Sequence, residues 1–252
     1  MLKDKLDLLY RKQFEELGSL EGTSIQIITV GNDVASEIYV RNKIKLLEKL
    51  NCRVVHTKLE ANITQDKLND QVYLYGREFT GQFVQLPLPE HLKEPDIPAF
   101  QDVDGFNSSN KKVLPCTVQA CLDIIQEIEG DIKGKNIAIL GRSNIVGLPL
   151  VVECIKLGGT VSSFNSNSVL PKKWDAYDIV VSATGNRFLT AEEFQNVNLV
   201  VDVGIHRVEG KVCGDIIHEK NKFLNSKNIT PVPFGVGRFT VLNVARNLKK
   251  IK

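Results

Sequence analysis

The sequence predicts an α/β protein in which two α/β domains flank a cleft, the second of them a Rossmann-type dinucleotide-binding domain. Two stretches of the chain each alternate short apolar runs with segments of helical periodicity, which is typical of parallel sheets. A segment with four prolines, residues 87–98, lies between the two stretches. Residues 135–149, KNIAILGRSNIVGLP, then pass from an apolar strand through a glycine-bounded turn into a helix, as dinucleotide sites do.

The first domain begins with an amphipathic segment, residues 1–17, that predicts a docked helix. The run SIQIITV is rich in β-branched residues and ends in Gly-Asn-Asp, so it predicts a strand at residues 24–30. Apolar residues then recur at helical spacing, and Ser36 and Glu37 suit the first turn of a helix. The elements expected after this strand are a helix at 35–50, a strand at 52–55, a helix at 64–75 and a strand at 81–86.

The second domain repeats the alternation. A helix at residues 117–128 is expected to bridge the two domains. The runs that follow predict a strand at 136–140, a helix at 146–157, strands at 160–164, 178–182 and 199–203, and a final helix at 236–250. Because parallel sheets carry their working loops at the carboxyl ends of the strands, the site residues are sought there.

The composition indicates an ordinary globular protein. Of the 252 residues, 42% are hydrophobic and 25% charged, and the net charge of +2 gives no reason to expect nucleic acid as a partner. No apolar stretch approaches the length of a membrane span, and the acids in the N-terminal segment argue against a signal or transit peptide. The five cysteines form no CxxC pair and the four histidines show no metal-ligand spacing, which predicts a reduced, cytoplasmic protein without structural metal.

The glycine-bounded turn predicts a dinucleotide site. Gly141 permits tight backbone geometry, Gly147 lets the helix pack close to the sheet, and amides at the helix start favour phosphate. The spacing is not GxGxxG, so the turn alone leaves binding and plain scaffold equally open. Residues 162–168, SSFNSNS, carry no acid for a ribose 2′-hydroxyl, and Arg142 suits a 2′-phosphate. NADP is therefore favoured over NAD, unless the Ser/Asn run is only a solvated loop.

A second set of residues predicts a reacting pocket in the first domain. Tyr39 and Lys43 are four apart and share one helix face, and a lysine among apolar neighbours can act as an acid/base group. Gln85 and Asp104 follow on loops expected at the same sheet edge. The amide can tune the lysine, and the carboxylate can hold the amino and ring N–H groups of a pterin. Singly, each residue also fits an ordinary structural role; together they indicate a site.

Eight stretches carry a resemblance that runs over nearly all of the chain: VGNDVASEIYVRNK (30–43), GQFVQLPLP (81–89), DVDGFNSSN (102–110), PCT (115–117), GRSNIVGLP (141–149), DIVVSATG (178–185), VVDVGI (200–205) and TPVPFGVGRFT (230–240). In this order they resemble the methylenetetrahydrofolate dehydrogenase/methenyltetrahydrofolate cyclohydrolase family. The resemblance implies a folate-binding catalytic domain at residues 1–115, completed by the C-terminal helix 233–252. It also implies an NAD(P)-binding domain at residues 116–232 and a homodimer through that domain.

The implied activity is a pair of reactions in one-carbon metabolism. NADP oxidises 5,10-methylenetetrahydrofolate to the methenyl form, and water then opens the ring to give 10-formyltetrahydrofolate. Lys43 is implied as the acid/base group, tuned by Gln85, while Tyr39 packs on the folate and Asp104 anchors the pterin. The residues implied for the cofactor are Gly141, Arg142, Ser143, Gly147, Ser166, Ile205 and, near the ring junction, Thr240.

The chain departs from the family pattern in several places. The usual PGGVGPMT is here PFGVGRFT, so Phe234, Arg238 and Phe239 enlarge or charge a loop expected beside the two ligands. Arg238 is expected to reach a phosphate, the folate glutamate tail or solvent. Asn165 and Asn167 stand where a histidine and a basic residue are usual, and Gln101 replaces a lysine before DVDG. Cys116 is expected to be a buried small residue in preference to a functional thiol.

Three other functions remain open at this point. A monofunctional, NAD-linked dehydrogenase of the same fold is the nearest, and the presence of Lys43 argues against it. A folate- or nucleotide-binding homologue whose catalysis has lapsed would explain the altered residues 234–239. An unrelated Rossmann dehydrogenase for a small hydroxy acid would have to carry the Gln85 and Asp104 motifs by chance.

Overall fold

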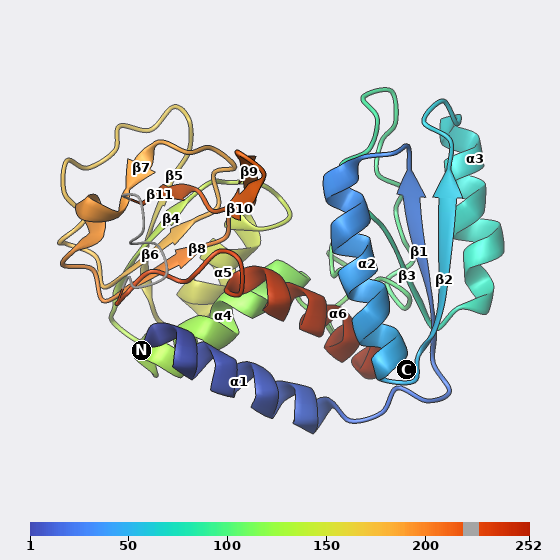
Figure 1. Cartoon of the computed structure of the whole chain (residues 1–252), viewed down its shortest axis with the longest axis horizontal. Helices are drawn as coiled ribbons and strands as arrows, with labels where there is room; N and C mark the ends of the chain where they lie inside the picture. Colours follow the sequence, from blue (N-terminus) through green and yellow to red (C-terminus); the bar gives the residue numbers. More distant parts are fainter. Residues whose placement is uncertain (219–226) are drawn as a thin grey trace. The chain divides into compact units, whose positions relative to one another are not determined.

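The computed structural model of the protein describes residues 1–218 and 227–252, and the chain divides into two compact units. Unit 1 comprises Met1–Gln13 with Thr117–Thr240, and unit 2 comprises Phe14–Cys116 with Val241–Lys252. Each unit contains a parallel sheet with helices beside it (Figure 1), which confirms the predicted α/β class and the two domains. Among the described residues, no helix has the length and apolar character needed to cross a membrane.

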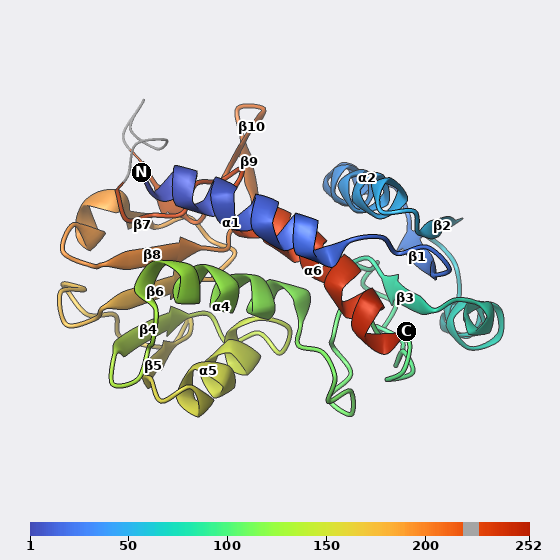
Figure 2. The same ribbon diagram turned by 90° about the horizontal axis from the view of Figure 1, so that it is seen from below.

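Helices at both ends of the chain belong partly to each unit. α1 (Leu2–Leu17) and α6 (Val236–Ile251) are seen along their length in Figure 2. The rings of Tyr10 and Phe239 pack edge to face with centroids 5.7 Å apart, which ties the start of α1 to the start of α6 within unit 1. The units therefore differ from the predicted boundaries, because the first residues of both helices group with the 117–240 segment.

The sheet of unit 2 has the strand order β2-β1-β3, all parallel. Its strands are β1 (Ser24–Val30), β2 (Arg53–Leu59) and β3 (Gly81–Val84). α2 (Val34–Lys49) connects β1 to β2 and begins where the Asp33 side chain accepts a hydrogen bond from the Ser36 N–H. β3 is shorter than the predicted 81–86 strand, since Pro87 has no N–H with which to extend the ladder. The carboxyl ends of all three strands consequently meet at one edge.

The segment predicted as a helix at residues 64–75 is helical, but its second half is not an α-helix. α3 (Gln65–Asp70) is α-helical, but Gln71–Tyr75 forms a π turn and Gly76–Glu78 a 3₁₀ turn. Buried amides contact the end of this segment: Gln82 Nε2 donates to the carbonyl of Val72 at 3.2 Å, and Gln101 Nε2 donates to the carbonyls of Gly76 at 2.9 Å and Phe79 at 2.6 Å. Gln101 thus fixes this turn in place, which accounts for a buried glutamine before the DVDG motif.

The sheet of unit 1 has the order β5-β4-β6-β8, also parallel. Its strands are β4 (Asn136–Leu140), β5 (Thr160–Phe164), β6 (Ile179–Ser182) and β8 (Leu199–Asp202), with helices α4 (Cys116–Glu129) and α5 (Gly147–Lys156). β5 lies on one side of β4, and the next strand in the sequence, β6, lies on the other side. Such a switch point, at the carboxyl end of β4, is where doubly wound sheets bind ligands.

The core of unit 1 is built around the tryptophan of the chain. Trp174 is fully buried in the connection between β5 and β6. Its ring lies 5.6 Å from that of Phe194 and 5.8 Å, edge to face, from that of Phe164. This aromatic cluster fills the space beside the sheet, with ring distances in the range of favourable aromatic pairs.

Several short elements of unit 1 were not predicted. They are the strands β7 (Leu189–Thr190), β9 (His206–Val208), β10 (Lys211–Cys213) and β11 (Ile216–Ile217), and a 3₁₀ turn at Ala191–Phe194. Runs of two or three residues are too short to show a periodicity.

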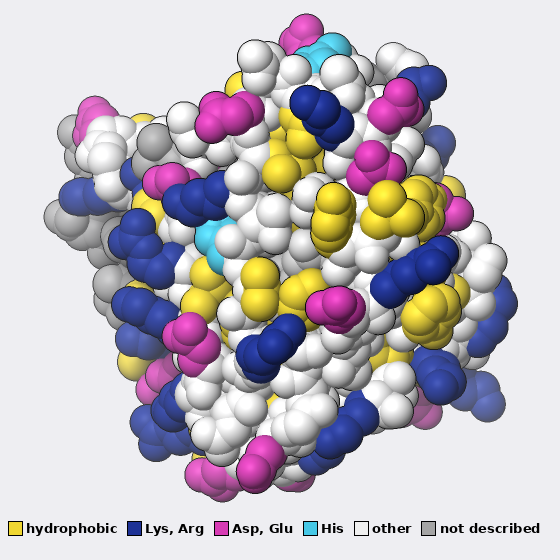
Figure 3. Space-filling view, turned by 90° about the vertical axis from the view of Figure 1, so that its right-hand side faces the viewer, with side chains coloured by type: hydrophobic (Ala, Val, Ile, Leu, Met, Phe, Trp, Pro, Cys, Tyr) yellow, Lys and Arg dark blue, Asp and Glu magenta, His cyan; other side chains and the backbone are white. Residues whose placement is uncertain are grey.

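On the face seen in Figure 3, acidic and basic side chains are interspersed with small apolar patches.

Candidate active site

The charged head of Lys43 lies at the carboxyl edge of the unit 2 sheet. Lys43 is 3% exposed, and its Nζ donates to Gln85 Oε1 at 3.2 Å. The same Nζ lies 3.6 Å from Asp104 Oδ1 and 5.8 Å from the centre of the Tyr39 ring. Gln85 directly follows β3, and Asp104 lies in the loop two residues after the bridge between Gln82 and Asp102. The four residues predicted for the reacting pocket are therefore brought together.

Two further contacts hold this lysine in place. The Phe83 ring centre is 3.8 Å from Lys43 Nζ, close enough for a strong cation–π contact. Gln85 Nε2 donates to the carbonyl of Leu86 at 2.8 Å, which turns the amide oxygen toward the lysine. Lys43 Nζ is thus held between an amide oxygen, a carboxylate and an aromatic face.

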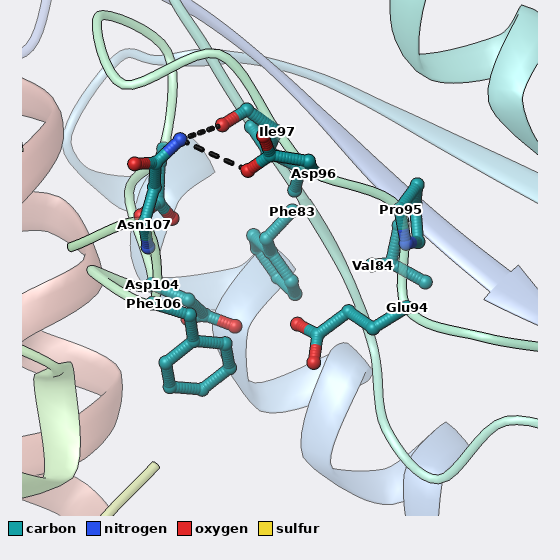
Figure 4. Close-up of a pocket in the computed structure, with 10 residues that line it drawn as sticks. Phe83, Val84, Glu94, Pro95, Asp96, Ile97, Asp104, Phe106 and Asn107 are labelled. Carbon is teal, nitrogen blue, oxygen red and sulfur yellow. Dashed lines mark hydrogen bonds between the residues drawn. The ribbon is translucent and has the colours of Figure 1, made fainter. Parts of the chain in front are cut away.

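A cavity of about 230 Å³ opens beside Asp104. Figure 4 shows its lining, which comes from the end of β3, the segment 94–97 and the loop 102–107: Phe83, Val84, Glu94, Pro95, Asp96, Ile97, Asp102, Asp104, Phe106 and Asn107. Aromatic and aliphatic walls with a few carboxyl groups suit a flat heterocycle that carries N–H donors.

The two aspartates of the DVDG motif have different roles. Asp102 accepts N–H bonds from Gly105 at 2.9 Å and Asn107 at 2.7 Å, so it holds its own loop. Burial raises the pKa of Asp102, and the bond from Asn107 opposes that shift. Asp104 instead faces Lys43 and the cavity. The second aspartate is thus the one available to a ligand.

Cys116 is inert in this setting. Its Sγ donates to the Val103 carbonyl at 3.2 Å and accepts from Asn247 Nδ2 at 3.4 Å. Complete burial raises the pKa of the thiol well above its ordinary value, so the nucleophilic thiolate is disfavoured. The prediction of a buried small residue is confirmed.

The turn after β4 has backbone contacts that admit only glycine. Gly141 has φ +106°, and a Cβ on it would lie 2.2 Å from the Ala183 carbonyl oxygen. A Cβ on Gly147 would lie 2.0 Å from the Gly141 carbonyl oxygen. Ser143 Oγ accepts from the N–H groups of Val146 at 3.2 Å and Gly147 at 3.4 Å at the start of α5. Gly141 and Gly147 thus leave the backbone at the start of α5 accessible, at the switch point of the sheet. This arrangement fits a pyrophosphate.

Arg142 is held across the end of the neighbouring strand. Its Nε donates to Ser163 Oγ at 2.9 Å, and Nη2 donates to the Ser163 carbonyl. Ser166 is exposed in the loop that follows β5, while Asn165 Oδ1 accepts from the Asn167 N–H at 3.1 Å. This loop presents hydroxyl and amide groups beside one guanidinium and no carboxylate, which is a donor set for a 2′-phosphate.

The other two residues predicted for the cofactor lie elsewhere in unit 1. Ile205 follows β8 and is 51% exposed. Thr240 is buried in α6, where its hydroxyl donates to the Val236 carbonyl at 3.2 Å. The structure therefore groups Gly141, Arg142, Ser143 and Gly147 in one turn, and the roles of Ser166, Ile205 and Thr240 stay predictions.

A buried carboxylate that the sequence did not single out joins the ends of β6 and β8. Asp215 is fully buried, and its oxygens accept from Ser182 Oγ at 2.9 Å and His206 Nε2 at 2.7 Å. They also accept from the N–H and hydroxyl of Thr184, at 2.8 and 2.9 Å. Neighbouring Asp202 accepts three backbone N–H bonds, and burial raises its pKa to about 6. In the sequence, the signal that could have pointed to this carboxylate is the Gly-Asp pair at 214–215.

Two of the altered family positions have structural explanations. Arg238 forms a salt bridge with Asp7 of α1, and its guanidinium lies 5.2 Å from the ring centres of Tyr10 and Phe239. α1 thus supplies both a charged and an aromatic partner for this guanidinium. Phe234 keeps φ at +82°, a left-handed conformation that costs a non-glycine residue about 1–3 kcal/mol.

Comparisons with known proteins agree with this geometry. Residues 2–104 match the family model described as "Tetrahydrofolate dehydrogenase/cyclohydrolase, catalytic domain". Residues 115–252 match the model described as "Tetrahydrofolate dehydrogenase/cyclohydrolase, NAD(P)-binding domain". The two models together span nearly the whole chain.

Individual relatives are similar over most of their length. The chain is 35% identical to "Bifunctional protein FolD" of Mycoplasma capricolum, covering 98% of this chain and 91% of the relative, and 34% identical to that of Bacillus subtilis, covering 95% and 90%. Among solved structures, the bifunctional FolD of Campylobacter jejuni has a TM-score of 0.78 at 30% identity, with 99% and 94% covered. FolD of Trypanosoma brucei, complexed with NADP cofactor and inhibitor, has a TM-score of 0.81 at 27% identity, with 98% and 94% covered.

Proposed function

Because the chain belongs to the tetrahydrofolate dehydrogenase/cyclohydrolase family, we propose that it oxidises 5,10-methylenetetrahydrofolate with NADP and hydrolyses the product to 10-formyltetrahydrofolate. The observation that carries the proposal is the placement of Lys43 between Gln85 and Asp104 beside an N–H-accepting cavity. In this proposal, residues 1–115 with the C-terminal helix 233–252 bind folate, and residues 116–232 bind the dinucleotide.

The dehydrogenase step depends mainly on alignment. When bound, NADP supplies nicotinamide C4 as the acceptor of the hydride that leaves the methylene carbon. Gly141 and Gly147 give the pyrophosphate room, Ser143 and Arg142 supply donors, and Ser166, Ile205 and Thr240 are proposed to complete the site. Asp104 holds the pterin N–H groups, and Tyr39 packs on the ring. Holding both rings in reacting geometry lowers the entropic part of the barrier.

The hydrolytic step depends on Lys43. Water adds to the cationic methenyl carbon, and Lys43 Nζ takes up the proton that the water loses. The bond from that carbon to the pterin nitrogen N5 then breaks, and Lys43 returns a proton to the departing nitrogen. One proton is released overall, which balances the cation that is consumed. Gln85 Oε1 orients Lys43 Nζ throughout, as its 3.2 Å contact allows.

The alternatives have less support. A monofunctional NAD-linked dehydrogenase has no use for the Lys43–Gln85 pair, and residues 162–168 offer no acid for an NAD ribose. A binding protein with lapsed catalysis has no need to keep the lysine buried between two polar partners.

A direct assay tests the proposed function. The purified protein is mixed with 5,10-methylenetetrahydrofolate and NADP or NAD, and absorbance of the reduced nicotinamide and of the methenyl compound is followed separately. We expect nicotinamide reduction without methenyl build-up, faster with NADP. Reduction with accumulating methenyl compound would favour the monofunctional enzyme, and no reduction by protein that still binds folate would favour lapsed catalysis.

The same assay on Arg142→Ala tests the cofactor preference. Removal of a charge-assisted bond to a phosphate should raise the KM for NADP about tenfold and leave the KM for NAD nearly unchanged. An equal effect on both cofactors would show that Arg142 does not contact the 2′-phosphate.

We also propose a homodimer formed through unit 1, in the reducing cytoplasm that suits five free cysteines. α5 carries an exposed apolar stripe at helical spacing, with Leu148 48%, Val152 42% and Ile155 55% exposed. A second copy of the chain would cover it. Sedimentation equilibrium should give twice the monomer mass, and Val152→Glu should shift it toward monomer; a monomeric wild type at micromolar concentration rejects the dimer.

A further inference from the structure

The cavity beside Asp104 is lined by a carboxyl group that the mechanism above does not use. Glu94 lies in the irregular segment between β3 and the DVDG loop. Figure 4 shows its carboxyl pointing across the cavity toward Asp104 and Phe106. The side chain remains solvent-accessible at the cavity mouth, and no hydrogen bond or salt bridge joins it to another described residue.

The neighbouring acids differ from Glu94 in having partners. Asp102 is occupied by backbone N–H groups, Asp96 accepts from Asn107 Nδ2 at 3.1 Å, and Asp104 pairs with Lys43. Partial burial, together with the charges of Asp104 and Asp102, raises the pKa of Glu94 to about 6. Glu94 is thus a carboxyl held beside like charges, with both oxygens available.

We propose that Glu94 is a second pterin-binding carboxyl, which accepts hydrogen bonds from N–H groups of the reduced folate alongside Asp104. The proposal rests on the proposed function, since it names how the same site recognises its substrate. A reduced pterin carries a 2-amino group and ring N–H groups at N3 and N8, and because these donors point from different edges of the ring, one carboxylate cannot face them all. The flat ring would enter between the Phe106 and Phe83 walls that line the cavity.

Equilibrium binding of the stable reduced folate 5-formyltetrahydrofolate tests the proposal. By calorimetry at pH 7.5, Glu94→Gln should weaken binding about tenfold, because it keeps the volume of the side chain and loses its charge. Glu90→Gln is the matched control, since Glu90 is exposed on the same segment and does not line the cavity. It should bind as the wild type does.

The pH dependence separates recognition from a structural role. Wild-type affinity should fall as the pH drops through about 6, because protonation removes the charged acceptor. The affinity of Glu94→Gln should not fall in this way. The facing groups Asp104, Asp102, Asp96 and Lys43 are present in both proteins, so a difference between the two pH profiles comes from Glu94. Equal affinities for the wild type and Glu94→Gln across this range would overturn the role of Glu94 and leave the proposed function unaffected. A wild type that neither binds reduced folate nor reduces NADP would overturn the proposed function as well.

Discussion

Lys43→Met should abolish hydrolysis of 5,10-methenyltetrahydrofolate, with a loss of about 10²–10⁴-fold, while folate still binds. Methionine fills most of the volume of the buried lysine stem but carries no proton to give or take. The contacts of Nζ with Gln85 at 3.2 Å and Asp104 at 3.6 Å are lost with the amino group. No group then remains at that position to accept the proton from water. Decay of methenyl absorbance, corrected for spontaneous hydrolysis, measures the effect.

The matched control for this variant is Lys45→Met. Lys45 lies on the same helix and is exposed, so its loss should leave hydrolysis unchanged. Binding of 5-formyltetrahydrofolate shows whether Lys43→Met still holds folate. Hydrolysis by Lys43→Met at the wild-type rate would remove the lysine from the mechanism.

Asp215→Ala should lower the free energy of unfolding of unit 1 by about 3–5 kcal/mol, the usual cost of removing one partner from a buried charged network. Four donors, from Ser182, Thr184 and His206, lose an acceptor that is itself fully buried. The protein has one tryptophan, Trp174, which is buried in unit 1. Urea denaturation followed by its fluorescence therefore reports on that unit.

Glu127→Ala is the control for the stability measurement, because Glu127 is exposed on α4. Its substitution should change the unfolding free energy by no more than about 0.5 kcal/mol. If Asp215→Ala unfolds at the wild-type urea concentration, the buried network does not stabilise unit 1.

Much of the scaffold followed from local pattern. β4 and β5 begin and end at the predicted residues, because each is an apolar or β-branched run bounded by turn residues. The grouping of Lys43, Gln85 and Asp104 followed from one topological rule, since parallel strands bring their carboxyl ends to a common edge.

The rest depends on contacts that no local pattern encodes. Asp215 finds its partner Ser182 from 33 positions away, and it lies between two very short strands. Arg238 is fixed by Asp7, 231 positions earlier in the chain. Glu94 lies in a segment without periodicity, so only the folded cavity shows which way it faces.

Asn247 ties the last helix of the chain to a loop made much earlier in the sequence. Its Nδ2 donates to the carbonyls of Val103 and Leu114, both at 3.0 Å, so residues 241–252 brace the loop that carries Asp104. During translation, this brace is made only after residues 117–240, which takes roughly 6–25 s at elongation rates of about 5–20 residues per second. The loop that carries Asp104 therefore lacks this brace while residues 117–240 are synthesised, and we expect a chain truncated before α6 to be cut more readily by proteases, because apolar side chains that α6 covers would be exposed.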